Sequence, residues 1–252
     1  MKTANLTSVA IAALLGIVML AGAGCTNSKT NQETSDNMET LNLTQEWDKK
    51  FPQSDKVNHR KVTFKNRYGI TLAADLYEPK NVEGKLAAIA VSGPFGAVKE
   101  QASGLYAQTM AERGFLTLAF DPSYTGESGG EPRNVASPDI NTEDFSAAVD
   151  FLTALPNVDA ERIGIIGICG FGGMGLNAAA MDTRIKATVA STMYDMSRVN
   201  ANGYFDAEDS ADDRNKKREM MNVIRTRDAQ SGTITPGVHG LPDSIDRKST
   251  RL

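Results

Sequence analysis

Residues 162–175 read RIGIIGICGFGGMG, and this stretch constrains the fold more than any other part of the chain. Its first seven residues alternate isoleucine with glycine and carry no charge after the opening arginine, which is typical of a central parallel strand covered on both faces. A helix is predicted to begin near Gly172, and a second apolar run follows at Ile185–Ser191. Strand, glycine turn, helix and strand form a βαβ unit, which presents its loops at the carboxyl edge of a sheet.

Cys169 lies at the tip of this turn, and three interpretations of it are open. In the first, the turn is a nucleophile elbow of the form Gly-x-nucleophile-x-Gly, although Phe171 occupies the position of the second glycine. In the second, Gly170–Gly175 match the dinucleotide-binding pattern G-x-G-x-x-G, with Asp195 near the position of a ribose-binding acid. In the third, Cys169 is one more buried small residue.

Length and composition exclude several classes of function. A chain of 252 residues with 40% hydrophobic residues is large enough to bury one good-sized core, so one folded domain is expected. A net charge of -4 gives no reason to expect nucleic acid as a partner. Two histidines and two cysteines, far apart in the sequence, form no cluster of metal ligands, and no cofactor is expected.

Residues 1–24 have the features of a secretory signal peptide. Lys2 precedes an apolar run, Val9–Leu20, that is too short for a comfortable membrane span, and small residues lead to Cys25. This arrangement resembles the lipobox of bacterial lipoproteins, except that Gly22 replaces the usual aliphatic residue. We therefore expect an exported protein anchored to the membrane of the bacterial cell envelope through a lipid on Cys25, on its periplasmic or outer-membrane face. The alternative is a cleaved leader and a soluble periplasmic protein.

The rest of the chain divides into a tether at 25–45, a core at 46–230 and an irregular tail at 231–252. Within the core, strands alternate with helices after an antiparallel start, which predicts an α/β fold with a mostly parallel sheet and helices on both faces. A charged helix is expected at Arg214–Arg227. We expect the sheet to lack its last strands, because the tail shows no periodicity. The other expected elements are a hairpin at Lys61–Lys65 and Ile70–Tyr77, strands at Leu86–Ser92 and Phe115–Phe120, and helices near 100–113 and 144–155.

Four segments together resemble the α/β-hydrolases, and more narrowly the dienelactone-hydrolase-like branch related to X-Pro dipeptidyl-peptidase-type acyl hydrolases, in its bacterial lipoprotein form. Within 62–198, the order of the turn at 120–133 and the glycine turn is the most specific part of this resemblance. The segments are GITLAADLYEP, SGPFGAVKEQ, FDPSYTGESGGEPR and GIIGICGFGGMGLNAA.

The resemblance implies hydrolysis of a small-molecule ester, lactone or amide with Cys169 as the nucleophile. The N–H of Gly170 would be one oxyanion donor. The second donor would come from the loop after Leu86–Ser92. Pro94 has no N–H, so Phe95 is the candidate donor and Gly93 is the alternative. Phe171 would line the pocket.

The resemblance also implies a catalytic acid and a histidine after the nucleophile, and the sequence offers poor candidates for both. His59 precedes the sheet, and His239 lies in a stretch with no strand before it. Asp195 follows a strand, where an aspartate is more often a turn or cap residue. We therefore expect an acyl hydrolase of impaired activity. The alternatives are an inactive truncated hydrolase or binding module and, less favoured, a nucleotide-binding domain.

Overall fold

The structure is a computed structural model, and it describes residues 41–193 and 195–235. The predicted leader, most of the tether, Cys25 and His239 lie outside these residues. Export, lipid anchoring at Cys25 and the position of His239 therefore remain predictions from sequence.

The described core is built on one mixed sheet of six strands in the order β1-β2-β4-β3-β5-β6. The first two strands form an antiparallel hairpin, and β2 pairs antiparallel with β4. From β4 to β6 all neighbours are parallel, as predicted for a βαβ architecture. The strands are β1 (Val57–Lys65), β2 (Thr71–Pro79), β3 (Leu86–Ser92), β4 (Leu116–Phe120), β5 (Val158–Ile168) and β6 (Ile185–Ser191).

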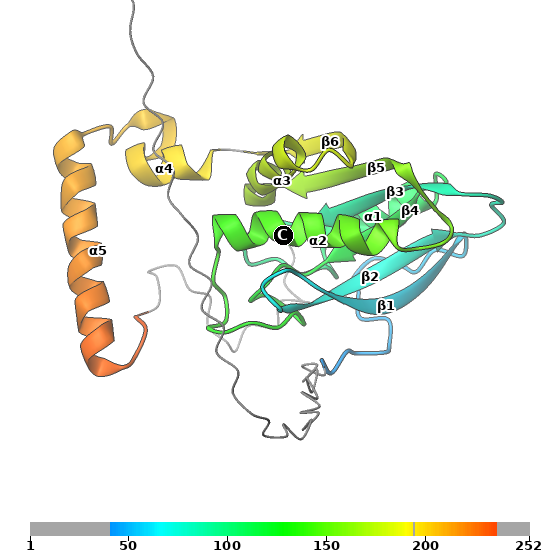
Figure 1. The fold of residues 1–252 in the computed structure, drawn as a ribbon, viewed down its shortest axis with the longest axis horizontal. Coiled ribbons are helices and arrows are strands. Elements are labelled where there is room, and N and C mark those ends of the chain that lie inside the picture. Colours follow the sequence, from blue (N-terminus) through cyan, green and yellow to red (C-terminus); the bar gives the residue numbers. More distant parts are fainter. Residues whose placement is uncertain (1–40, 194, 236–252) are drawn as a thin grey trace, which may run out of the picture. The chain divides into compact units, whose positions relative to one another are not determined.

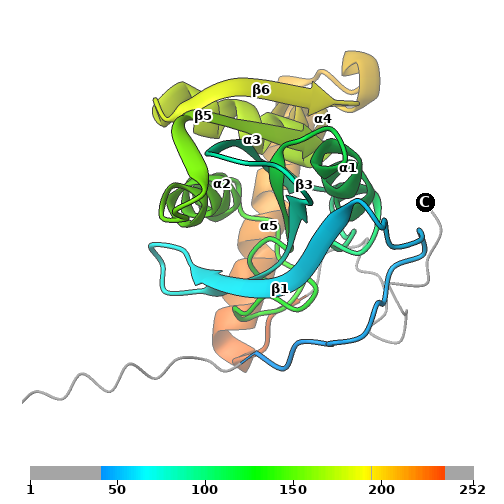
Figure 2. The same ribbon diagram turned by 90° about the vertical axis from the view of Figure 1, so that its right-hand side faces the viewer.

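Three helices pack against the sheet, on both of its faces (Figures 1 and 2). Buried residues of α1 belong to one hydrophobic cluster, and those of α2 and α3 belong to a second cluster across the sheet. This arrangement confirms the predicted three-layer α/β fold. The helices are α1 (Ala102–Ala111), α2 (Pro138–Thr153) and α3 (Gly170–Met181), followed along the chain by α4 (Met196–Asn202), a 3₁₀ turn η1 (Tyr204–Asp206) and α5 (Ala211–Ser231).

The larger hydrophobic cluster is organised around aromatic rings. Phe145 of α2 packs edge-on against Phe120 of β4, with ring centroids 5.3 Å apart, and lies 6.3 Å from Phe171 of α3. All three side chains are at most 1% exposed. Aromatic pairs in these geometries add to the stabilisation that comes from burying their area. The rings therefore fix two helices against the sheet next to the predicted glycine turn.

Several predicted boundaries were wrong, among them the start of β1, which is Val57 and not Lys61. Two of the others have identifiable local reasons. Helix α2 begins at Pro138, not near residue 144, because Ser137 caps it through its hydroxyl and proline is favoured in the first helical turn. Strand β5 begins at Val158, four residues before the predicted start, because Val158 already pairs with Leu86 of β3. The charged segment before Ile163 is therefore strand as well.

The C-terminal part of the described chain buries little. Ile185 is the single buried residue of β6, the last strand of the described sheet. Helix α5 is longer than the predicted 214–227 and contains no buried residue, and Met220 and Met221 are more than half exposed. In residues 41–193 and 195–235, no helix has the length and apolar character that crossing a membrane requires.

Replacing Phe145 by alanine should lower the free energy of unfolding by about 3–5 kcal/mol, because it removes a fully buried ring and leaves a cavity against two other rings. Urea denaturation monitored by circular dichroism measures this change. Met181→Ala is the matched control in α3, since that side chain is 71% exposed and its loss should change stability by less than about 0.5 kcal/mol. Equal effects of the two substitutions would contradict the assignment of the core.

Candidate active site

The turn from β5 into α3 places Cys169 in a conformation that side chains rarely adopt. Its backbone has φ 58° and ψ -126°, and it directly precedes the first residue of α3. Non-glycine residues in such sparsely populated regions cost roughly 1–3 kcal/mol and concentrate at functional sites. The side chain is a thiol of intermediate burial, and the backbone N–H donates to the carbonyl oxygen of Ser191 at 2.9 Å. The sharp strand-to-helix turn predicted from the glycines is therefore present.

Glycine is required on both sides of Cys169 because other atoms approach closely, the backbone of Phe171 at Gly167 and the side chain of Phe95 at Gly170. A Cβ on Gly167 would lie 2.2 Å from the carbonyl oxygen of Phe171. A Cβ on Gly170 would lie 2.1 Å from the ring of Phe95. Both distances are far below van der Waals contact, so only glycine lets the chain double back here.

The dinucleotide interpretation of the same glycines finds no support in their surroundings. Phe95 occupies the space above Gly170. Met193 occupies the space above Gly172, where an added Cβ would lie 2.8 Å from the Cβ of Met193. Gly175 faces Ile165 of the sheet at 3.4 Å. In a phosphate cradle, glycines leave room for the ligand and expose their N–H groups to it. Here all three glycines accommodate other parts of the protein.

A cavity of about 310 Å³ adjoins the turn. Gly170 and Gly173 form part of its wall, so the cavity begins at the residue after Cys169. Most of the other lining side chains are apolar or small, which suits an uncharged organic group. The remaining lining residues are Pro138, Met174, Leu176, Asn177, Met193, Asp195, Met196 and Ser197.

The loop between β3 and α1 meets the turn through Phe95. The half-buried Phe95 ring covers Gly170 and lies 5.4 Å from the ring of Phe171. The structure thus brings together the three residues predicted from sequence for the centre: Cys169, Gly170 and Phe95. Phe171 does not line the cavity as predicted. It is 1% exposed, because α3 directs its ring into the core beside Phe145.

The acid and base candidates have other partners. Asp195 borders the cavity, but it is the N-cap of α4 and accepts hydrogen bonds from the hydroxyl of Ser197 at 2.6 Å and the N–H of Arg198 at 3.0 Å. These hydrogen bonds lower the pKa of Asp195. His59, the single histidine of the described residues, contacts the Asp75 carboxylate through Nε2 at 2.8 Å. Its ring packs against those of Trp47 and Tyr77.

A buried cluster of charges joins the same loop to the next one, and sequence reasoning missed it. At its centre the fully buried Nζ of Lys99 donates to Glu100 at 2.6 Å, to Glu127 at 2.7 Å and to Asp121 at 3.0 Å. Asp121 also accepts from the backbone N–H of Lys99 at 2.7 Å and from that of Glu127 at 2.9 Å. Its carboxylate lies so close to Gly126 that a Cβ there would be 2.2 Å away. The loops after β3 and β4 are therefore fixed to each other.

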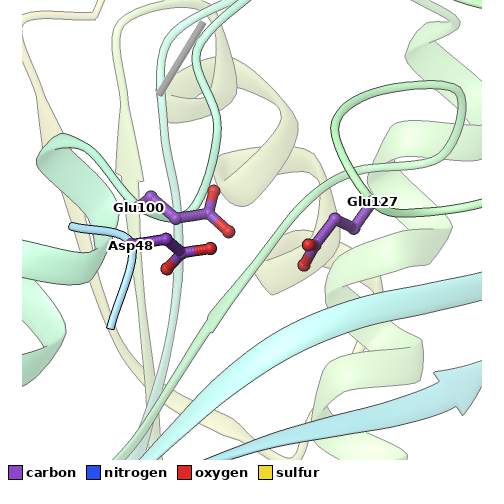
Figure 3. A group of neighbouring side chains, drawn as sticks. All are labelled: Asp48, Glu100 and Glu127. Atoms are coloured by element: carbon purple, nitrogen blue, oxygen red, sulfur yellow. The ribbon is translucent and has the colours of Figure 1, made fainter. Parts of the chain in front are cut away.

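Asp48, Glu100 and Glu127 point toward a common centre, as Figure 3 shows, with one oxygen of each within 4.8 Å of the others. Three converging carboxylates could hold a divalent cation. The Nζ of Lys61 contacts all three, at 3.0, 3.4 and 2.9 Å in that order, and Lys99 contacts two of them. The ammonium groups provide the positive charge that a metal would supply, and we assign no metal to this group.

The pKa values in the cluster follow from the competition between burial and these ammonium groups. Burial by itself would raise the pKa of Glu127, but the charge of Lys99 and the hydrogen bonds from Lys99 and Lys61 outweigh it and hold the pKa well below its ordinary value. Burial and the neighbouring charge of Asp121 raise the pKa of Glu100. The fully buried Glu100 therefore binds a proton more readily than Glu127, which is partly exposed.

The charged cluster extends to the hairpin formed by β1 and β2. Asp75 of β2 contacts Lys49 at 3.1 Å as well as His59. Burial would raise the pKa of Asp75, but the hydrogen bond from His59 and the charges of Lys49 and Lys99 lower it. A signal for this cluster was present in the sequence, since the glycine-rich loops carry charged residues at 99–100, 121 and 127. Sequence alone gave no reason to pair them with the segment at 48–61.

Replacing Gly167 by alanine should lower the free energy of unfolding by about 1–3 kcal/mol or more, because its Cβ would overlap a backbone oxygen that cannot move independently. The control is Gly173→Ala, three residues beyond the start of α3, where nothing lies within 4 Å of the added methyl. Alanine is the better helix former, so this variant should gain about 0.5–1 kcal/mol. Urea denaturation of both variants measures the contrast, and a Gly167→Ala protein as stable as the wild type would contradict the turn geometry.

Glu127→Gln should cost more stability than Glu100→Gln at pH 7, by about 1.5–3 kcal/mol, the usual value of hydrogen bonds to charged groups. The folded pKa of Glu127 is lowered, so its contribution is present above about 4.5 and is lost as the pH falls toward the folded value. The folded pKa of Glu100 is raised, so its ionisation removes stability as the pH rises above about 4.5. Urea titrations at pH 3.5, 5 and 7 measure this, and the cost of Glu127→Gln should shrink at pH 3.5. A larger cost for Glu100→Gln at pH 7 would refute the assignment.

Comparison with known proteins agrees with this geometry. Residues 68–234 match the family described as X-Pro dipeptidyl-peptidase (S15 family). The chain is 64% identical to protein PA2218 of Pseudomonas aeruginosa over 225 residues, which make up 88% of this chain and 60% of PA2218. It is 31% identical to thiohydrolase aneE of Aspergillus aculeatus over 137 residues, 54% of this chain and 42% of that protein. The chain thus spans less than two thirds of the length of these relatives.

Solved structures show the same architecture. The crystal structure of PA2218 has a TM-score of 0.76 at 66% identity, covering 82% of this chain and 65% of that one. The α/β hydrolase GrgF of a Penicillium species has a TM-score of 0.60 at 26% identity, covering 71% of this chain and 57% of that one. The family match extends over more than half of the chain and includes the glycine turn. With its mixed sheet and elbow-like turn, the chain belongs to the X-Pro dipeptidyl-peptidase (S15) family and has the α/β-hydrolase fold.

Proposed function

We propose that the chain carries an acyl-hydrolase centre in which Cys169 is the nucleophile. The observation that carries this proposal is the strained backbone of Cys169 at the strand-to-helix turn, with a cavity beginning at the next residue. A strained turn of this kind presents a nucleophile above the sheet and turns the following N–H toward the reacting carbonyl. The similarity to aneE, which is named a thiohydrolase, supports an acyl substrate.

In the proposed reaction the Cys169 thiolate attacks the carbonyl carbon of an ester, lactone or amide. The carbonyl electron pair moves onto oxygen, and the N–H groups of Gly170 and Phe95 donate to that oxyanion. Collapse of the intermediate expels the alcohol or amine, which leaves with a proton from solvent, and forms an acyl thioester on Cys169. Attack by water on this thioester releases the carboxylic acid and restores the thiol.

The proposal gives none of the described residues the role of general base. His59 is engaged with Asp75 and two aromatic rings, and Asp195 caps a helix. A thiol depends less on a base than a hydroxyl does, because a few per cent of a thiol is ionised near pH 7. Acylation can therefore proceed without a histidine, and steady-state turnover should be lower by about 10³-fold or more than in an enzyme with a complete triad.

The alternative proposal is a non-catalytic module, or an inactive hydrolase, that retains the cavity and binds the acyl compound. The observation that favours it is the engagement of His59 away from the turn. The two proposals share a small-molecule acyl ligand, and both are compatible with attachment to the cell envelope through Cys25. They differ in whether a covalent bond to Cys169 forms.

Incubation with p-nitrophenyl butyrate should release about one equivalent of nitrophenolate per chain in a burst and add one butyryl group to Cys169. Cys169→Ala should abolish the burst, because no nucleophile remains at the turn. The burst is followed by absorbance, and the acylated residue is located by mass spectrometry of the peptides.

Cys25→Ala is the matched control, because it removes the other cysteine of the sequence and should leave the burst unchanged. A burst of equal size in wild type and Cys169→Ala would exclude Cys169 as the nucleophile. Reversible binding of the ester without any burst would favour the non-catalytic module.

A further inference from the structure

We propose that Lys99 is a positioning residue for the oxyanion donor on the loop after β3. This inference rests on the proposed acyl-hydrolase function, since it concerns the second donor of that centre. Within the described residues, the hydrogen bonds and ion pairs of Lys99 go to Glu100, Asp121 and Glu127, and none of these residues lines the cavity. Lys99 acts through the loop that carries Phe95, four residues earlier in the chain.

The main chain of Lys99 is fixed at two points. Its N–H donates to Asp121 at 2.7 Å. Its carbonyl oxygen lies against α1 at Gly104, where a Cβ would be only 2.3 Å away. The end of the loop therefore lies between the carboxylate that follows β4 and the first turn of α1, and a shift of the loop would break the hydrogen bond to Asp121 or change the close packing against Gly104.

The side chain of Lys99 adds a third anchor. All three ammonium donors are used, on carboxylates that come from the loop itself and from the segment after β4. The side chain is fully buried, and desolvating an ammonium group costs several kcal/mol even after relaxation. Because apolar residues of similar volume often stabilise a fold as well as buried ions do, stability alone does not account for this cluster.

The other end of the loop touches the turn that carries the thiol. A short turn with a hydrogen bond from the N–H of Ala97 to the carbonyl of Pro94, at 3.0 Å, encloses Phe95. The Phe95 ring lies on Gly170, at the place where a Cβ would come within 2.1 Å. A shift of the Lys99 anchor would therefore be transmitted over four residues to both predicted donors, while the Cys169 backbone would stay bonded to Ser191.

The test compares two reactions of the same thiol. Acylation by p-nitrophenyl butyrate passes through an oxyanion and uses the donors, whereas alkylation by iodoacetamide displaces iodide and forms no oxyanion. In Lys99→Met, which keeps the alkyl stem and removes the charge, acylation should slow by about 10- to 100-fold, which is at or below the 10²–10³-fold loss for deleting a donor outright. Alkylation should stay within twofold of wild type.

Glu127→Gln provides a second variant if Lys99→Met fails to fold, because Glu127 is nearer the surface, with 13% of its side chain exposed. It should slow acylation by about 3- to 10-fold with the same unchanged alkylation, since it weakens one of the three contacts of Lys99. Leu152→Ala is the control for stability alone. Leu152 is a fully buried residue in the last turn of α2 and does not line the cavity, so its loss should leave both rates within twofold.

Wild-type acylation rates in a folded Lys99→Met or Glu127→Gln protein would overturn the inference and leave the proposed function intact. A parallel fall of acylation and alkylation would overturn it as well, because it would mean general damage to the turn. Absence of acylation at Cys169 in the wild type would instead refute the proposed function, and the inference with it.

Discussion

The ammonium groups of Lys61 and Lys99 hold together parts of the chain that would otherwise repel one another. Five carboxylates converge beside the β1–β2 hairpin, from the segment before β1, from β2 and from the loops after β3 and β4. Three lysines and His59 face them, so the positive charges are no more numerous than the negative ones. At an interior dielectric, such interactions are several times stronger than in water. These lysines therefore connect the two loops to each other. The carboxylates are Asp48, Asp75, Glu100, Asp121 and Glu127.

The sheet topology explains why this cluster and the thiol share one side of the molecule. Strands β3, β4 and β5 run parallel, so the loops that follow them leave the sheet at the same edge. The loop after β3 lies between the other two, because β3 is the middle strand of the three. It contacts the β4 loop through Lys99 and the β5 turn through Phe95. The nine-residue loop between β3 and α1 thus links the buried Lys99 cluster to the turn that carries Cys169.

Sequence reasoning succeeded where the determinant is local. The spacing of glycines around Cys169 predicted a sharp turn, and the positive φ of Cys169 and the close approach at Gly167 and Gly170 are its physical cause. The strands Leu86–Ser92 and Ile185–Ser191 were predicted with their observed bounds. The first is an apolar run between turn residues, and the second keeps enough apolar residues to be recognised although Lys186 and Thr188 interrupt it. The start of α2 was missed although Ser137 and Pro138 signal it.

Sequence reasoning failed where the position of a side chain is set by a contact between distant segments. Phe171 was expected in the pocket because it replaces a glycine of the usual elbow, but α3 turns its ring into the core, where two other phenylalanines receive it. The pairing of Lys61 with Glu100 and Glu127 spans 39 and 66 residues of sequence. Charge patterning along the chain cannot identify such partners. His59 was predicted to precede the sheet, but it lies in β1, and its contact with Asp75 of β2 could not be predicted from sequence.

The strained turn at Cys169 and the buried ammonium group of Lys99 both cost free energy, which suggests that both serve the same site. A positive φ at a cysteine and a desolvated ammonium group both cost free energy, and neither is needed to close an α/β sheet. The apolar clusters on the two faces of the sheet stabilise the fold without them. Departures from local preference that persist in a well-packed structure are expected at sites where geometry serves chemistry. Here the two departures lie on neighbouring loops and are joined by the contact of Phe95 with Gly170, so they fix one arrangement of thiol and amide groups.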